Sequence, residues 1–210
     1  YTTLFRSIDH PDLLSSTHEA QVQRGVGAAL YGAASVGGAV SLETPAFGEA
    51  RAGHVSLAYG DYRTRRAMIE LDSGRLAGGW NLYGRYSRVE TNGYREQSWS
   101  RLWSYSFGAR KTAGNHSLRL HLFGGPEETH LAYKGAPRAV LDGGRTGNAD
   151  QDRRFNPLTY DGERDHFFEP HYEFIHSWMP NPSLTLTGTW FWFDGRGYYD
   201  ERRYGQALAD

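Results

Sequence analysis

Arginine, lysine and tyrosine side chains occur together in predicted loops of this chain, where they could bind an anion. The six side chains are Tyr94, Arg95, Tyr133, Lys134, Arg153 and Arg154. Guanidinium groups bind carboxylates and similar oxyanions through paired hydrogen bonds, and loops held by a rigid scaffold commonly carry binding residues. We therefore predict that these residues contact an anionic ligand. The alternative is that they belong to solvated, mobile loops and bind nothing.

The sequence contains no residue pattern for catalysis or for metal binding. The chain has no cysteine, which excludes disulfides and thiolate chemistry. Neither a G-x-S-x-G segment nor an H-E-x-x-H pair occurs. His166, His171 and His176 are five residues apart, so on a strand neighbouring histidines point to opposite faces and cannot share one metal ion. We expect no enzyme activity, no metal and no cofactor.

Five glycines in the first quarter of the chain resemble a nucleotide-binding loop at first sight: Gly25, Gly27, Gly32, Gly37 and Gly38. The segment from Gly25 to Leu30 lacks the last glycine of the dinucleotide fingerprint, and no Lys-Ser or Lys-Thr pair follows it. Because glycine accepts positive φ without steric cost, we interpret these residues as tight turns. Short strands are predicted at 20–23 and at 36–44, the second of which includes Gly37 and Gly38.

The composition favours a membrane β-barrel over a soluble enzyme. Lysine and arginine number 23 against 24 acidic residues, so a net charge of −1 gives no basic excess for binding nucleic acid. Aromatic residues make up 14% of the chain and glycine numbers 26, yet the mean hydropathy is only −0.66. A membrane barrel has a polar interior and aromatic residues at its interfaces, which accounts for this combination.

Alternation of apolar and polar residues predicts seven strands in the rest of the chain. They cover 54–59, 66–72, 80–87, 103–110, 118–122, 172–178 and 184–192. The second face of these strands carries Arg, Glu, Asp and Asn, which suits a wet lumen. A β-sandwich has the same alternation, with its apolar face turned inward, so the period alone does not separate the two folds.

Two further features favour the barrel. Five tryptophans fall on the apolar face near predicted strand ends, as in an interfacial girdle, although ordinary core tryptophans are the alternative; they are Trp80, Trp103, Trp178, Trp190 and Trp192. The connections at 74–79, 112–115 and 179–183 are tight, whereas 124–166 is expected to be one long irregular loop. An open sheet cannot lie in lipid with unpaired edges, so we expect the chain to be a fragment of a longer protein.

The segment from Val22 to Gly32, followed by Gly37-Gly38-Ala39-Val40-Ser41-Leu42, resembles the end of the plug domain in TonB-dependent outer-membrane receptors. Four later blocks, 92–96, 123–129, 154–157 and 195–199, resemble the branch of this family that is common in Bacteroidetes-type bacteria. Val26 stands where the family usually has proline, and the strand at 41–44 is more polar than usual. These departures leave the class of ligand open.

The resemblance implies an all-β fold: the C-terminal part of a plug at 1–48, then about seven strands of an incomplete transmembrane antiparallel β-barrel at 49–210. A long extracellular loop is expected near 124–166. The implied function is energy-coupled uptake of a scarce ligand across the bacterial outer membrane. That ligand is most often a ferric siderophore, otherwise cobalamin, haem or an oligosaccharide.

The implied partners are outer-membrane lipid and the TonB complex of the inner membrane, which would contact a segment that is not in this sequence. Arg24 is implied to connect the plug to acidic residues on the barrel wall, since a buried guanidinium needs a carboxylate. Two other functions remain open. One is a passive porin or adhesin barrel without a coupled plug, and the other is a soluble all-β carbohydrate-binding or hydrolase domain.

Overall fold

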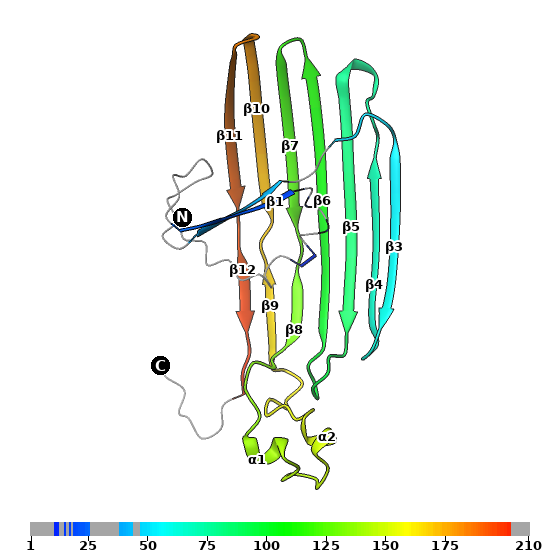
Figure 1. Ribbon diagram of the computed structural model, residues 1–210, viewed down its shortest axis with the longest axis vertical. Helices are drawn as coiled ribbons and strands as arrows, with labels where there is room; N and C mark the ends of the chain where they lie inside the picture. Colours follow the sequence, from blue (N-terminus) through cyan, green and yellow to red (C-terminus); the bar gives the residue numbers. More distant parts are fainter. Residues whose placement is uncertain are drawn as a thin grey trace.

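The computed structural model describes residues 11–12, 15, 17, 19–25, 38–43 and 47–202. Most of them form antiparallel strands, which Figure 1 shows side by side as one tall sheet. The strands are β1 (Glu19–Arg24), β2 (Gly38–Glu43), β3 (Ala52–Gly60), β4 (Thr64–Asp72), β5 (Trp80–Thr91), β6 (Ser100–Ala113), β7 (His116–Gly124), β8 (Glu127–His130), β9 (Arg164–Phe168), β10 (His171–Asn181), β11 (Leu184–Phe193) and β12 (Arg196–Tyr199). The helices are a 3-10 turn (Ala77–Gly79), α1 (Arg138–Leu141) and α2 (Ala149–Asp152). Within these described ranges, no helix is long and apolar enough to cross a membrane.

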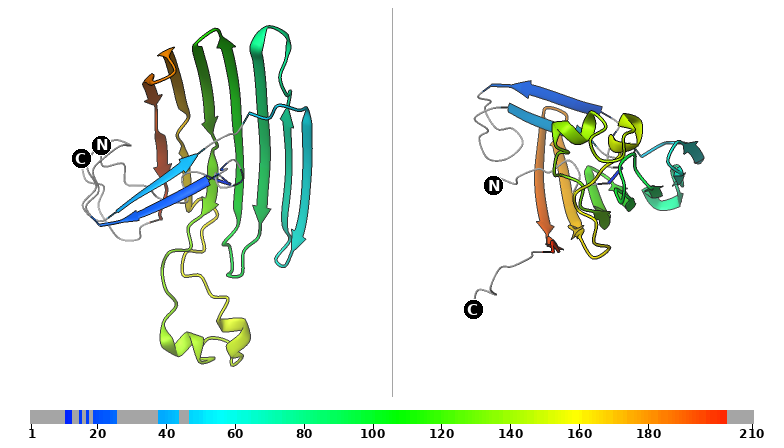
Figure 2. Two further views of the ribbon diagram at one scale, coloured as in Figure 1. Left: turned by 45° about the horizontal axis from the view of Figure 1, so that its top comes forward. Right: turned by 90° about the horizontal axis from the view of Figure 1, so that it is seen from below.

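The main sheet is a meander with the order β3-β4-β5-β6-β7-β10-β11. All seven strands predicted from alternation are present in it. The tight turns β6–β7 and β10–β11 lie at the opposite end of the sheet from α1 and α2 (Figure 1). β1 and β2 pair antiparallel as a separate two-stranded sheet that runs across the strands of the main sheet on one side of it (Figure 2). The sequence therefore predicts the main sheet well, because each of its strands carries a clear alternation.

The prediction of one long irregular loop at 124–166 is wrong, because both ends of this segment form strands. β7 breaks at Gly125-Pro126 and continues as β8, which pairs with β6 and β9. Proline has no N–H to donate to the ladder, so the ladder is interrupted here. A Cβ on Gly125 would lie 2.1 Å from the Trp103 carbonyl oxygen, so only glycine fits this close approach to β6. β9 and β10 are separated at Pro170 in the same way, and β12 extends β11. Only residues 131–163 connect β8 to β9.

The two faces of the sheet have the reverse polarity of a soluble protein. Leu57 and Trp192, for example, are 77% and 65% exposed on the outer face. The opposite face is polar and largely buried, with members on three neighbouring strands: Asn81, Arg85, Ser87, Ser104, Ser106 and His121. An apolar outside and a polar inside are the pattern of a barrel wall that meets lipid. All five tryptophans of the predicted girdle lie on the exposed, apolar face.

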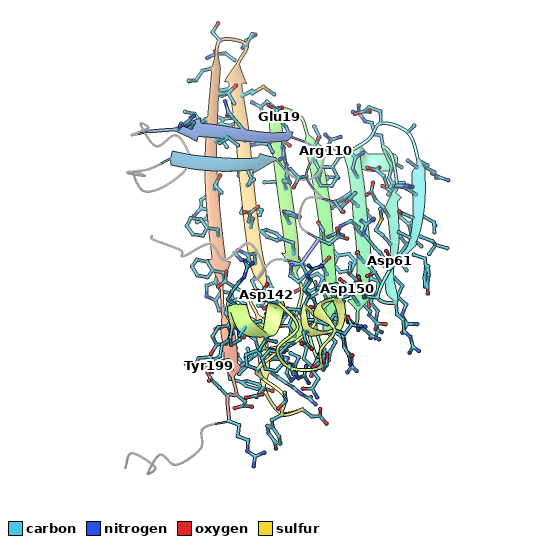
Figure 3. The ribbon with its side chains drawn as sticks, turned by 60° about the horizontal axis from the view of Figure 1, so that its bottom comes forward. Glu19, Asp61, Arg110, Asp142, Asp150 and Tyr199 are labelled. Atoms are coloured by element: carbon cyan, nitrogen blue, oxygen red, sulfur yellow. The ribbon has the colours of Figure 1, made fainter. Side chains whose placement is uncertain are left out.

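The chain enters the sheet through a segment that is tied to its inner face. The Gly48 N–H donates to Asp72 Oδ2 at 2.8 Å, and Asn81 Nδ2 donates to the Gly48 carbonyl at 2.9 Å. The Arg110 guanidinium lies 5.3 Å from the centre of the Phe47 ring. These contacts position the start of β3 against β4, β5 and β6, at the end of the sheet away from Asp142 and Asp150 (Figure 3).

Candidate functional site

Three connections meet at one end of the sheet and enclose a cavity of about 530 Å³. They are the β3–β4 turn, the β5–β6 connection at 92–99 and the segment 131–163, which carries α1 and α2 and is called the helical lobe below (Figures 1 and 3). Arginine and aromatic side chains dominate the lining: Tyr62, Arg63, Arg95, Trp99 and Arg154. Guanidinium groups beside aromatic faces can bind an anionic, flat ligand by ion pairing and stacking.

Arg95 lines this cavity and also holds its walls together. Its guanidinium donates to the carbonyl oxygens of Phe155 at 3.1 Å, Ala132 at 2.6 Å and Lys134 at 2.8 Å. All three carbonyls belong to the helical lobe, so Arg95 fastens the lobe to the β5–β6 connection. The three nitrogens of the planar guanidinium each reach a different carbonyl, whereas a lysine side chain has only one nitrogen.

Arg154 and Tyr94 make the reciprocal connection. Arg154 Nε donates to the Tyr94 carbonyl at 3.1 Å, and the Glu96 N–H donates to the Arg154 carbonyl at 2.6 Å. The Tyr94 ring meets the Tyr62 ring edge-on at 5.5 Å. Three of the six predicted ligand residues, Tyr94, Arg95 and Arg154, therefore lie at or beside the cavity.

The other three predicted residues lie elsewhere on the lobe. The Tyr133 hydroxyl donates to Glu201 Oε2 at 2.6 Å, and Lys134 forms an ion pair with the same carboxylate. The hydrogen bond to Glu201 raises the pKa of Lys134 above its ordinary value. Arg153 pairs with the exposed Asp150 at 2.9 Å. None of these three lines the cavity, and their role in binding stays a prediction.

Tyr62, Arg63 and Trp99 are lining residues that the sequence does not single out. Tyr62 and Arg63 occupy a turn between two strands and adopt φ values of 57° and 56°. Left-handed backbone at two successive non-glycine residues is unusual and marks a constrained turn. The sequence offered one indication of a binding role, namely an aromatic residue next to an arginine in a three-residue turn. The same two residue types also occur in ordinary polar turns, so the sequence did not distinguish the two cases.

The helical lobe has a hydrogen-bonded core of its own. The buried Asp152 carboxylate accepts from the backbone N–H groups of Arg145 and Thr146 at 2.9 and 3.0 Å, and from the Thr146 hydroxyl at 2.7 Å. Burial alone would raise the pKa of the Asp152 carboxyl, but these hydrogen bonds outweigh burial and lower the pKa below its ordinary value of 3.8. Asn148 caps α2 by accepting from the N–H groups of Asp150 and Gln151.

A second polar cluster lies on the inner face of the sheet and includes a residue from the N-terminal part of the chain. Asp12 Oδ2 accepts from Arg66 Nη2 at 3.0 Å and Nε at 3.2 Å, from Arg85 Nη1 at 3.4 Å, and from the Ser87 hydroxyl at short range. Ser15 Oγ donates to Asp12 Oδ1 at 2.5 Å. Burial raises the pKa of Asp12, but hydrogen bonds from the two serines and Arg66 lower it below its ordinary value of 3.8. The Arg85 side chain is only 1% exposed.

The resemblance implies an ion pair between Arg24 of the plug and acidic residues of the barrel wall. The cluster around Asp12 is an ion pair of this kind with the two charges exchanged. The acid comes from the N-terminal segment, and the arginines come from β4 and β5. Arg24 lies exposed at the end of β1 opposite Gly38, and it forms no ion pair with any residue that the structure describes. Gly25 has φ of 87°, as a turn requires. Gly27, Gly32 and Gly37 lie outside the described residues.

Ser106, His121 and Glu173 line up on the inner face in the order of a hydrolase triad. Ser106 Oγ lies 2.9 Å from His121 Nε2, and His121 Nδ1 lies 3.5 Å from Glu173 Oε2. Ser106 is fully buried, and its backbone sits in a central strand between Arg85 and Phe123. A hydrolase needs an accessible nucleophile beside free N–H donors. We therefore interpret these residues as a cross-strand polar contact that fills the inner face.

The three histidines at 166, 171 and 176 confirm the predicted alternation of faces. His166 pairs with Glu128 and His176 with Leu118, both toward the outside, whereas His171 pairs with Phe123 on the inner face. Within the part of the chain that the structure describes, no group of three or more metal-ligating side chains comes together.

No family model and no curated protein matches the chain. Among solved structures, the chain is similar to the crystal structure of the ferric-catecholate import receptor Fiu from E. coli K12 in its open form, with a TM-score of 0.71. The match covers 88% of this chain at 13% sequence identity, and it spans 29% of the length of that receptor. At this identity the likeness shows the fold alone. It confirms the predicted fold class, an antiparallel sheet that forms part of a β-barrel.

Proposed function

We propose that this chain is part of a bacterial outer-membrane receptor that imports a ferric siderophore by TonB-dependent transport. One observation carries the proposal: Asp12 of the N-terminal segment is bound to the polar inner face of a wall whose outer face is apolar. A soluble domain would turn its apolar face inward, and a passive porin would have no plug segment bound inside. The four sequence blocks noted above support the Bacteroidetes-type branch of this receptor family.

The outer face supports a position in the lipid bilayer. Its exposed leucines and aromatic residues extend over neighbouring strands, and in water such an area would be an aggregation site. In lipid the same area is stabilised, and the edge strands β3 and β11 would pair with further strands of a closed barrel. The end of the sheet that carries the helical lobe would then face the outside of the cell.

The cavity at that end supports an anionic ligand with aromatic character. Arg63, Arg95 and Arg154 supply positive charge against Glu96, and Tyr62 and Trp99 supply ring faces. A ferric tris-catecholate is an anion with flat aromatic arms, which these groups suit. Its iron is cargo, and we assign the protein no catalytic step and no resident metal.

In the proposed cycle the cavity captures the ligand, and TonB then pulls on the plug. The contacts of Asp12 with Arg66 and Arg85 must break for the N-terminal segment to leave the wall. Charge-assisted hydrogen bonds of this kind keep the path closed at rest, and the energised inner-membrane complex supplies the work that separates them.

Uptake by the full-length receptor tests this proposal. Cells that express the receptor are given radioactive ferric tris-catecholate, with and without TonB, and parallel cells are given cobalamin, haem or an oligosaccharide. We expect uptake of the ferric complex only when TonB is present. Uptake that persists without TonB would indicate a passive barrel. Purification of the receptor as a soluble monomer without detergent would indicate a soluble domain.

A further inference from the structure

The wall of the sheet presents a preformed set of donors to the carboxylate of Asp12. The Arg66 fork gives Nε and Nη2 to Asp12, Arg85 gives Nη1, and Ser87 gives its hydroxyl. Arg85 is also fixed by Ser104, whose hydroxyl accepts from Nη2 at 3.1 Å. This contact within the wall holds the Arg85 side chain independently of Asp12. We call Arg66, Arg85 and Ser87 the wall cradle.

The cradle is positively charged and removed from water. Arg85 is 1% exposed and Arg66 is 25% exposed, and Glu70 on β4 is directly opposite Arg85 in the strand register. Asp12 forms ion pairs with both guanidinium groups, so its departure removes a negative charge from both of them. A desolvated charge without a counter-ion is strongly unfavourable. Departure of the plug segment therefore favours the binding of another anion at the same place.

The cradle begins on the strand that follows the β3–β4 turn of the cavity. Arg63 lines the cavity, and Arg66 follows it three residues later at the start of β4. At about 3.3 Å per residue, three residues of a strand correspond to about 10 Å. On the proposed path, an anion would move along this strand from Arg63 toward Arg66.

We propose that the wall cradle is a second binding site for the anionic oxygens of the transported ligand, and that Asp12 occupies this site at rest. The transport role of the site rests on the function proposed above. While the plug is closed, the Asp12 carboxylate occupies the position of the ligand oxygens and neutralises the arginines. When the plug moves, the catecholate or carboxylate oxygens of the transported ligand replace it. Binding at the cavity and transfer along the wall use separate arginines.

Chemical rescue tests the cradle without any transport. The full-length receptor in detergent carries Asp12→Ala, and its melting temperature is measured with sodium acetate or with sodium chloride at equal ionic strength. We expect acetate, but not chloride, to restore several degrees of the lost stability by filling the vacated carboxylate position. Asp12→Ala/Arg66→Gln should lose this response. Asp12→Ala/Arg88→Gln, which alters an exposed arginine on the next strand, should keep it.

Two outcomes of this experiment would overturn the proposal. One is an equal effect of acetate and chloride on Asp12→Ala. The other is an acetate response that survives Arg66→Gln. Both are readable even if the receptor transports a different ligand, so failure of the cradle is distinguishable from failure of the proposed function.

Uptake separates a binding site from a simple plug fastening, because the two roles predict opposite signs. Asp12→Asn keeps the arginines and should leave the uptake of radioactive ferric tris-catecholate unchanged or raise it. Arg66→Gln removes a charged donor and should lower maximal uptake about tenfold, with the surface Kd unchanged. If the contact only fastened the plug, Arg66→Gln would match Asp12→Asn. Absence of uptake by the wild-type receptor would instead refute the proposed function.

Discussion

Single side chains hold the external cavity in shape, and Arg95 is the clearest case. One guanidinium bonds three carbonyls that belong to another segment of the chain. The sequence identified Arg95 as a candidate because of its residue type and loop position, but its main contacts are with the protein itself. The role of Asp12 could not be predicted, because its arginine partners are 54 and 73 positions away and nothing local marks it.

Replacing Arg95 by glutamine should loosen the helical lobe. Loss of three charge-assisted hydrogen bonds should lower the free energy of local opening by about 2–3 kcal/mol. Hydrogen exchange of the peptides around Ala132 and Phe155, measured by mass spectrometry, checks this. Arg153→Gln is the matched control. Among the residues that the structure describes, Arg153 pairs with the exposed Asp150 carboxylate, so the effect of this substitution should stay within about 0.5 kcal/mol. Equal effects of both substitutions would contradict this role of Arg95.

Acid should open the same lobe through Asp152. Because its folded pKa lies below the ordinary value of 3.8, the carboxylate contributes stability above that value. This contribution is lost as the pH falls through the folded pKa, so protection of residues 142–156 should drop below pH 3.8. Hydrogen exchange corrected for intrinsic rates measures the drop. Asp150→Asn should keep this pH response and Asp152→Asn should abolish it; a response that survives Asp152→Asn would assign it to another group.

At the scale of elements, the strands with clear alternation were predictable and the short strands beyond the breaks were not. β8 and β9 have the sequences Glu-Glu-Thr-His and Arg-Asp-His-Phe-Phe, in which polar residues occupy both faces. In the proposed orientation they stand above the lipid, where water solvates the outer face as well, so no apolar period is required. β8 pairs with β6, which is long enough to span both β7 and β8, and β9 in turn pairs with β8.

An arginine in the centre of the outer face should separate lipid from water as the surroundings of this face. Leu120 is the middle residue of β7 and is exposed between Ala109 and Phe174. Leu120→Arg should destabilise the full-length receptor by about 2–4 kcal/mol in a phospholipid bilayer. Thr189→Arg, on the inner face of β11, is the control and should cost far less. The folded fraction in vesicles against urea measures both, and a neutral Leu120→Arg would argue against a lipid-facing wall.

At the scale of the whole molecule, the function proposed here requires the N-terminal segment to move relative to the wall. The fold of the wall was predictable because each of its strands alternates between an apolar outer face and a polar inner face. The arrangement of the segment inside was not, because an irregular segment is positioned by individual polar contacts such as those of Asp12. The ends of the wall also differ: tight turns and the entry segment at 47–50 lie at one end, and the cavity lies at the other.

A reversible crosslink can test this movement, since the 210 residues contain no cysteine that would interfere. Asp12→Cys/Ser87→Cys places two thiols where the side chains now touch. Oxidation should stop uptake while ligand binding at the cell surface persists, and a reductant should restore uptake. Each single cysteine variant is the control. Full uptake with the disulfide demonstrably formed would show that the segment does not need to leave the wall.

The continuation of β7 into β8 and of β10 back into β9 has a consequence for the living cell. The sheet does not end at the kinks beside Pro126 and Pro170, so in the proposed orientation the helical lobe is raised clear of the lipid on paired strands. That makes the lobe the part of this chain that antibodies, phages and proteases meet first. A short epitope inserted after Gly135, where the backbone is open to solvent, would label the receptor on intact bacteria and report its orientation directly.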